Sequence, residues 1–443
     1  MRTLRRLLLC APLLLLLLVV AGCNSENDPT PRVYAEPIDG RVPADAWSGF
    51  RGASHNGRSP ELGFPIKWEA KNIRWSRSLP GSGNSSPIVW HKRVFVTAAA
   101  QKSRERRVAI GTSDRSYSVN DELVLICLDR SDGSIIWKRP VIRVAGRTHH
   151  KNGHASSTPA TDGECVYVNA GSFGLFCFDF HGNQRWRTLL GDMSHQWGTA
   201  SSPIVTGNVV IQLCDSERGS SIRAFNNASG KPLWQTPRVS KGAWSTPVLF
   251  FGAGGTPQVV VNGTGTSDGS PGSVISYAVK DGRELWRREG TSDIPCPTAI
   301  VDGRWIVSSS GSNGPILGIE FDQGPKIRWS VSSGGPYVPT GVIVGPHLYL
   351  ISDGGVMTCR KLGDGELVWR QRLRDSFSAS LISAEDRIYA VSERGTVYVV
   401  AASAKFKLLA TNHLRESTLA TPAFASGEII LRTAKRLHCI AKQ

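Results

Sequence analysis

Histidine is the residue type whose spacing in this chain first suggests chemistry. His149, His150 and His154 lie within one loop, residues 147–154, and His195 holds a comparable place further along. Neutral imidazoles bind Zn²⁺ and other transition metals, so this set is a candidate metal site. The spacing matches no standard zinc motif, however, and no carboxylate lies nearby in the sequence to orient the rings. A solvated loop is the favoured interpretation, and we predict no bound metal.

Aromatic residues mark further loops of the same kind. Trp197, Trp244 and Tyr337 each stand just before the start of an apolar strand. Loops held on a rigid scaffold often carry binding residues, so convergence of these loops would form a binding surface. Ordinary packing at the strand starts remains an open alternative. The candidate binding face comprises His149, His150, His154, His195, Trp197, Trp244 and Tyr337.

A basic insertion is the third candidate. Residues 98–122 contain Lys102, Arg104, Arg106 and Arg107, in a chain whose 52 Lys and Arg against 36 Asp and Glu give a net charge of +16. Such a loop can dock on an acidic partner or on anionic lipid head groups. A solvated run of charge is the favoured interpretation, and nucleic acid is not an expected ligand of an exported protein.

Patterns typical of catalysis are not recognisable in the sequence. We find no Ser/His/Asp triad, no carboxylates at hydrolase spacing and no phosphate-binding glycine loop, because the 46 glycines fall in turns. We therefore do not predict an enzyme.

An internal repeat positions all these loops. Each unit begins at Ser/Thr-Pro, continues through three apolar strands and an Asp/Asn/Gly turn, and ends in tryptophan. Such units predict the four-stranded antiparallel blades of a β-propeller. The copies span residues 85–137, 157–186, 201–234, 245–286, 297–329, 339–369 and 378–409, followed by a shorter copy from Thr421.

The terminal tryptophans occupy the same position in each repeat unit. We predict that they fill the wedges between neighbouring blades rather than stack on a substrate, because a periodicity of this length indicates architecture. The residue is lost near Leu409, which predicts a weaker junction there. The set comprises Trp75, Trp137, Trp186, Trp234, Trp286, Trp329 and Trp369.

The short last copy has room for three strands only, and an unpaired blade edge would be open to other chains. Residues 72–76, Asn-Ile-Arg-Trp-Ser, have the Ile-x-Trp ending of a terminal strand, as residues 326–329 do. We predict that this N-terminal strand completes the last blade. The chain from Trp75 onward then gives about 46 residues to each of eight blades, a usual size for propeller units. The predicted fold is an all-β, eight-bladed propeller.

Cysteines recur at one point of the repeat. Cys127, Cys177, Cys359 and Cys439 hold this position, and we align Ala224 and Ala278 with them. We predict small buried core residues, one per blade and too far apart to form disulfides.

The N-terminus reads as an export signal. Arg2, Arg5 and Arg6 precede an apolar run that ends in Val-Ala-Gly-Cys at Cys23, which resembles a bacterial lipobox. The predicted domains are a signal peptide at 1–22, a lipidated Cys23 with a flexible tether at 23–45, and one propeller at 46–443. Asn24 favours the outer over the inner membrane, so we expect a periplasm-facing envelope lipoprotein.

The repeat resembles the pyrroloquinoline quinone (PQQ)-type repeat family, whose unit ends Ala-x-Asp-x-x-Thr-Gly-x-x-x-Trp. Residues 127–137 match with Cys for Ala and Asp for Thr, and Ala224 through Gly230 to Trp234 match again. Residues 47–68 also resemble the lead-in of bacterial secreted propellers of this family. The family includes quinoprotein dehydrogenases and, in its BamB-like branch, non-catalytic outer-membrane assembly lipoproteins.

The resemblance implies alternatives for function. A quinoprotein would require PQQ, calcium and a catalytic carboxylate, and the chain lacks the vicinal Cys-Cys pair of such family members and a cytochrome Cys-x-x-Cys-His. We therefore predict no cofactor and a monomeric, protein-binding scaffold of the BamB-like branch, with envelope proteins as partners. A PQQ- and calcium-dependent dehydrogenase and a polysaccharide- or small-ligand-binding propeller remain the alternatives.

Overall fold

The computed structural model describes residues 42–442 except 102–107, 110–114, 243, 253–254, 264–270 and 293–294. The predicted signal peptide, Cys23 and the four basic residues of the insertion lie outside this part. Among the described residues, no helix has the length and apolar character needed to cross a membrane.

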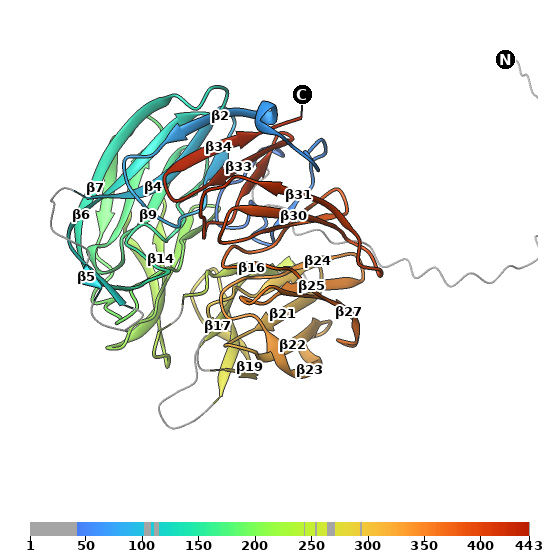
Figure 1. Cartoon of the computed structure of the whole chain (residues 1–443). Coiled ribbons are helices and arrows are strands. Elements are labelled where there is room, and N and C mark those ends of the chain that lie inside the picture. Colours follow the sequence, from blue (N-terminus) through green and yellow to red (C-terminus); the bar gives the residue numbers. More distant parts are fainter. Residues whose placement is uncertain are drawn as a thin grey trace, which may run out of the picture. The chain divides into compact units, whose positions relative to one another are not determined.

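The described chain forms eight antiparallel sheets arranged as blades 1 to 8 (Figure 1), which confirms the predicted propeller. Blades 1 to 4 contain β3 (Ile88–Trp90), β4 (Arg93–Gln101), β6 (Arg115–Asp129) and β7 (Ile135–His149); β8 (Ala160–Thr161), β9 (Cys165–Asn169), β10 (Leu175–Asp179) and β11 (Gln184–Thr188); β12 (Ile204–Thr206), β13 (Val209–Cys214), β14 (Ser220–Asn226) and β15 (Pro232–Arg238); β16 (Val248–Phe251), β17 (Pro257–Gly263), β18 (Gly272–Ala278) and β19 (Glu284–Thr291).

Blades 5 to 8 contain β20 (Ile300–Asp302), β21 (Trp305–Ser309), β22 (Gly314–Phe321) and β23 (Pro325–Gly335); β24 (Val342–Val344), β25 (His347–Ile351), β26 (Val356–Lys361) and β27 (Leu367–Arg372); β28 (Ile382–Ala384), β29 (Arg387–Val391), β30 (Thr396–Ala401) and β31 (Leu408–His413); β32 (Ala423–Ala425), β33 (Glu428–Arg432), β34 (Arg436–Ile440) and β2 (Ile73–Ser78). The remaining elements are β1 (Arg58–Ser59), β5 (Val108–Ala109) and the 3₁₀ turns η1 (Ala70–Asn72) and η2 (Gly171–Phe173).

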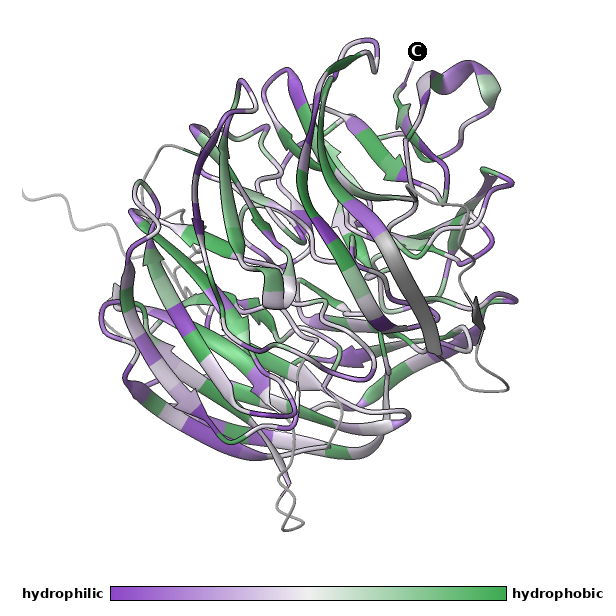
Figure 2. Ribbon diagram, turned by 90° about the vertical axis from the view of Figure 1, so that its left-hand side faces the viewer, coloured by the Kyte–Doolittle hydropathy of each residue, from purple (hydrophilic) through white to green (hydrophobic). Residues whose placement is uncertain are grey.

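Strand position decides the pattern of burial. Middle strands such as β25 have neighbouring blades on both faces and are almost wholly buried, whereas in the outer strand β11 only Trp186 is buried. Figure 2 shows the resulting mixture of apolar and polar residues along the outer strands. The core is therefore divided among the wedges between blades, each sealed by its outer strand.

Blade 8 contains strands from both ends of the propeller. β2 pairs antiparallel with β34, with Trp75 opposite Cys439 and Ser78 opposite Arg436 (Figure 1). The predicted closure by an N-terminal strand is confirmed, so no edge of β34 is left open to another chain.

The repeated tryptophans lie at the junctions between blades. Six of the seven donate the indole Nε1–H to a backbone carbonyl of the next blade, for example Trp186 to Asn227 O at 2.8 Å. Trp286 differs, because it donates to Gln258 Oε1 of its own blade at 3.0 Å. The turn glycine of the next blade lies against the ring: a Cβ on Gly230 would fall 2.6 Å from Trp186. This close approach, together with a φ of 68° at Gly230, requires glycine.

A small residue lies opposite each of these tryptophans in the sheet. Cys127, Cys177, Cys359 and Cys439 are fully buried in this position. The alignment of Ala278 with them was wrong: Ser276 pairs with Trp286, and Ala278 lies two residues further on at the turn. The ring leaves no room for a larger neighbour, and in blade 5 a Cβ on Gly318 would approach Trp329 to 2.0 Å.

Residues 42–68, the lead-in segment, span one end of the central channel. Trp47 bridges to Val89 of blade 1, and β1 pairs in parallel with β28 of blade 7. Between them, the buried Arg51 donates to four carbonyl oxygens, those of Asn56, Thr340, Gly341 and Leu381, at 2.6–3.2 Å. These contacts hold the segment across the ring.

The lead-in segment also fills the junction where the repeat loses its tryptophan. Phe64 and Trp68 are buried in the core cluster that joins blades 7 and 8, beside the partly buried Leu409. The side chain of Asn412 accepts from Trp68 N at 2.9 Å and donates to Ile66 O at 2.9 Å. An aromatic ring from another part of the chain thus occupies the wedge.

His55 of the lead-in segment should make stability depend on pH. Burial lowers its pKa from 6.5 to about 4, so the folded protein keeps the ring neutral while the unfolded chain takes up a proton below pH 6.5. Stability is therefore complete above pH 6.5 and falls as the pH approaches 4. Between pH 7 and 4.5, we expect the wild type to lose about 2 kcal/mol more than His55→Asn in urea unfolding.

The exposed His91 provides the matched control, since it shares the positive φ of His55, 50° against 54°. His91→Asn should follow the wild-type pH profile. Equal losses in the wild type and His55→Asn would contradict the assignment.

Candidate functional site: the mouth and walls of the central channel

The channel contains a cavity of about 170 Å³ to which all eight blades or the loops that enter them contribute. Phe50 of the lead-in segment lies at its wall, and serine, threonine and asparagine side chains make up much of the remainder. Among the described residues that line the cavity there is no carboxylate.

A ring of hydroxyl groups surrounds the channel, one from the first strand entrance of each blade. In seven successive junctions the hydroxyl oxygen of one blade accepts the backbone N–H of the blade before it, at 2.9–3.1 Å. All members are buried and line the cavity. We call this set the hydroxyl ring: Ser86, Thr158, Ser202, Thr246, Thr298, Thr340, Ser380 and Thr421.

The eighth junction, between blades 8 and 1, uses a different contact. Arg432 of β33 donates Nη1–H to Ser85 Oγ at 2.7 Å and to Thr97 O at 2.6 Å. Its Nε and Nη2 are buried without a hydrogen-bond partner. A guanidinium therefore links the last blade to the first.

Three aromatic side chains form a cluster at the mouth of the cavity. The His195 and Trp244 rings meet edge to face with centroids 4.7 Å apart, and Trp197 lies 5.4–5.5 Å from both. Trp244 Nε1 donates to Gly198 O at 2.8 Å, which joins the entrance of blade 4 to that of blade 3. Trp197 and Trp244 are partly buried, the side chain of His195 is only 7% exposed, and the three rings share a fixed arrangement.

The loop that follows β7 supports this cluster. Asn152 Nδ2 donates to Trp197 O at 2.8 Å, and His149 N donates to the same oxygen at 3.0 Å. Lys151 reaches Glu393 of blade 7 at 2.7 Å, and Glu393 also accepts from Ser378 Oγ. Residues from blades far apart in the chain thus meet around one opening.

Burial governs ionisation near the channel. It lowers the pKa of His195 below its ordinary value, with Glu217 acting in the opposite direction. Burial raises the pKa of Cys296 to about 12, and the carboxylate of Asp353 adds to this effect. The Cys296 thiol is therefore protonated at neutral pH and is not poised as a nucleophile.

The structure brings together four of the seven predicted face residues in the cavity wall: His149, Trp197, Trp244 and Tyr337. His195 lies behind the two tryptophans, and His150 packs on His149 with ring centroids 4.2 Å apart. His154 lies in the same loop. In the described part of the chain no three His, Cys, Asp or Glu side chains gather closely enough to hold a metal ion.

Sequence reasoning missed the hydroxyl ring, although its signal was present. The Ser/Thr-Pro dipeptides that marked the repeat starts carry these hydroxyls at Ser86, Thr158, Ser202, Thr246 and Thr421. In each of these five dipeptides the proline directly follows the residue that carries the ring hydroxyl, and it precedes the first strand of the blade.

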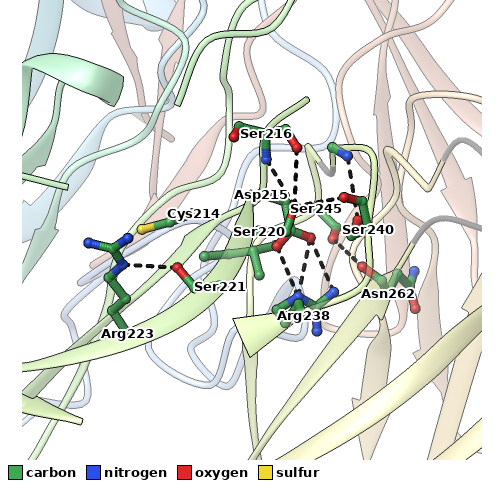
Figure 3. Close-up of polar contacts among 12 residues, drawn as sticks. Cys214, Asp215, Ser216, Ser220, Ser221, Arg223, Arg238, Ser240, Ser245 and Asn262 are labelled. Atoms are coloured by element: carbon green, nitrogen blue, oxygen red, sulfur yellow. Dashed lines mark hydrogen bonds and ion pairs between the residues drawn. The ribbon is translucent and has the colours of Figure 1, made fainter. Parts of the chain in front are cut away.

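A buried ion pair within blade 3, at its junction with blade 4, was also missed. Arg238 and Asp215 point toward each other (Figure 3), with Nε–Oδ1 at 2.9 Å and side chains at most 1% exposed. Arg238 Nη1 donates to Tyr277 OH of blade 4 at 2.6 Å. Burial acts against the charge of Arg238, but Asp215 and Tyr277 together hold its pKa above the ordinary value.

This eight-bladed ring with tryptophan-sealed wedges and a narrow channel defines the class of PQQ-like β-propellers. The family model for "Outer membrane protein assembly factor BamB" matches residues 97–219, 218–357 and 321–441. The chain belongs to this family.

Relatives with that name are distant in sequence. The Escherichia coli K12 protein is 23% identical over 422 residues, covering 90% of this chain and 99% of its own length. The Alkalilimnicola ehrlichii protein is 24% identical over 173 residues, covering 39% of this chain and 43% of its own.

Solved structures share the fold. BamB from Moraxella catarrhalis has a TM-score of 0.55 at 14% identity, over 78% of this chain and 98% of that one. A europium-containing methanol dehydrogenase has a TM-score of 0.64 at 11% identity, over 90% of each chain. The quinohemoprotein alcohol dehydrogenase from Comamonas testosteroni has 0.64 at 11% identity, over 90% of this chain and 80% of that one. At these identities the similarity concerns the fold alone.

Proposed function

We propose that this protein is a non-catalytic scaffold of the cell envelope that binds protein partners during outer-membrane protein assembly. The single observation that carries the proposal is membership of a family described as outer-membrane assembly factors. The Escherichia coli K12 relative with that description aligns over 90% of this chain. We further propose that Cys23 carries the lipid anchor, that the propeller faces the periplasm from the outer membrane, and that it is monomeric.

The aromatic cluster at the channel mouth is the proposed contact surface. Trp197, Trp244 and His195 are fixed by hydrogen bonds and by one another, so little side-chain entropy is lost when a partner covers them. Aromatic residues are enriched in the energetic centres of protein interfaces. Tyr337 extends the surface across the opening.

The walls of the channel support a non-catalytic role. A quinoprotein site needs a carboxylate base and a calcium ion with six to eight oxygen ligands. The described lining residues include no carboxylate, and the cavity of about 170 Å³ is below the roughly 300–1,000 Å³ of ordinary small-molecule sites. The residues present therefore do not fit PQQ with calcium.

Site-specific photo-crosslinking in intact cells tests the proposal. A photoreactive amino acid at Trp197 should form an adduct with a component of the outer-membrane assembly machinery, identified by mass spectrometry. The matched control is Leu62, which is 75% exposed on the lead-in segment. We expect the adduct from Trp197 and not from Leu62.

An identical adduct pattern at both positions, or an adduct only with polysaccharide, would overturn the proposed contact surface. Calorimetric titration with PQQ, with and without calcium, tests the enzymatic alternative. We expect no saturable heat, and tight calcium-dependent binding would contradict the non-catalytic assignment.

A further inference from the structure

Two buried arginines beside the channel have no carboxylate partner. Arg51 and Arg432 are both fully buried, and neither forms an ion pair with any residue in the described part of the chain. Each donates only to backbone carbonyls and, for Arg432, to one hydroxyl. Burial of an uncompensated cation is costly, so a compensating negative charge would be strongly favoured.

Each guanidinium bonds to a member of the hydroxyl ring or to the residue next to one. Arg51 bonds to the carbonyl of Thr340, a ring member, and Arg432 bonds to Ser85, the neighbour of Ser86. They act at two nearby blade junctions, Arg51 at that of blades 6 and 7 and Arg432 at that of blades 8 and 1. Burial lowers the pKa of each to about 9, so both are charged at neutral pH.

Arg432 is held close under the channel wall. A Cβ on Gly83 would fall 2.6 Å from its Nη2, and the next residue, Asn84, lines the cavity. Its Nε and Nη2 have no hydrogen-bond partner, and neither does Nε of Arg51. Buried donors without partners are rare in folded proteins. They indicate that an acceptor, or a nearby negative charge, is missing from the site.

The ring itself supplies further donors. In seven members the oxygen already accepts a backbone N–H, which fixes its position and leaves the hydroxyl hydrogen available to donate. Asn84 and Asn152 add amide groups to the same walls. The described lining residues include one cation, Lys151, and no carboxylate, while Glu393 and Asp353 lie directly behind them and accept hydrogen bonds from Lys151, Ser378 and Tyr337 N. The charges of Arg51 and Arg432 behind the wall have no such carboxylate partner, and salt screens them only weakly inside the protein.

We propose that the central channel is a binding site for an oxyanion, a carboxylate or phosphate group small enough for a cavity of about 170 Å³. The hydroxyl ring donates hydrogen bonds to the oxygens, and Arg51 and Arg432 supply the compensating charge from behind the wall. Lys151 and Glu393 at the mouth modulate access and affinity, because they place one positive and one negative charge at the opening.

Calorimetry on the full-length protein in detergent tests this site. Sodium phosphate and sodium acetate serve as probes of the two anionic groups, with sodium chloride titrated at equal ionic strength. We expect saturable binding of one oxyanion per chain, and the preferred probe distinguishes a phosphate-bearing from a carboxylate-bearing ligand. A response to phosphate and acetate no greater than that to chloride would overturn the proposal.

Two substitutions at the mouth give opposite expectations. Lys151→Gln removes the positive charge and should weaken oxyanion binding by about 5-fold, whereas Glu393→Gln removes the negative charge and should strengthen it by a similar factor. Lys361→Gln and Glu366→Gln break an exposed ion pair on blade 6 and are the matched controls, with wild-type affinity expected. Unchanged affinity in both mouth variants would contradict a site in this channel.

Thermal melting provides a second readout. The preferred anion should raise the Tm of the wild type in a saturable manner, as expected for a ligand that binds only the folded state. The same rise in Lys151→Gln should require a higher anion concentration. A Tm increase that grows linearly with salt and is the same in all variants would indicate a general salt effect and overturn the site.

Discussion

Asp215→Ala should destabilise the propeller by about 4 kcal/mol, because it leaves Arg238 buried without its counter-charge. The wild-type carboxylate accepts three contacts from the guanidinium at 2.9–3.2 Å, and neither side chain has appreciable exposure (Figure 3). Water cannot replace the carboxylate without opening the junction between blades 3 and 4. Urea unfolding of the variant against the wild type measures the loss.

Two controls separate charge from packing. Asp215→Leu combined with Arg238→Met removes the whole pair and should recover most of the stability, because similar apolar volume carries no desolvation cost. Glu284→Ala breaks the exposed pair with Arg287 and should change stability by less than about 0.5 kcal/mol. If Glu284→Ala cost as much as Asp215→Ala, burial would not be the cause.

Trp75→Ala should also cost about 4 kcal/mol, through the loss of a large buried ring at the junction that closes the propeller. Trp75 is 7% exposed, donates to Arg130 O at 2.7 Å and packs against Gly133 of blade 1. The variant leaves both a cavity and an unpaired carbonyl in the contact between the first and last blades. Thermal and urea unfolding report the effect.

Trp329→Ala is the matched variant, since Trp329 has the same exposure and hydrogen-bond geometry between blades 5 and 6. Its stability loss should be similar, but Trp75→Ala should in addition increase protease cleavage near residues 73–78, because β2, unlike β23, is not joined by a turn to the strand with which it pairs. Equal cleavage in both variants would show that Trp75 does not secure the closing strand.

The blades could be predicted from sequence because each one repeats the same local requirements. A strand-turn-strand pattern, a turn glycine and a terminal tryptophan recur at nearly constant spacing, and the closing strand shares the Ile-x-Trp ending of the repeat. Periodicity failed where the spacing changed: in blade 4 a small residue was sought two positions too late, at Ala278 instead of Ser276.

The unrepeated contacts could not be predicted in the same way. Arg51 meets carbonyls about 290 and 330 residues away, and Arg432 reaches back to blade 1. Such pairs depend on ring closure, which no local pattern encodes. The mouth residues are an intermediate case, because loop positions suggested that Trp197, Trp244 and Tyr337 converge, but not that Lys151 and Glu393 meet beside them.

Blade 8 combines strands from both ends of the propeller, and this imposes an order on the folding of the protein during synthesis. β2 is synthesised first among its strands, yet its partner β34 is added some 360 residues later. At usual rates of 5–20 residues per second, the first strand waits roughly 20–70 s for its partner. During that interval a basic, aromatic segment is exposed, and only β34 converts an open spiral into a closed ring. Addition of β34 is therefore the step that commits this fold.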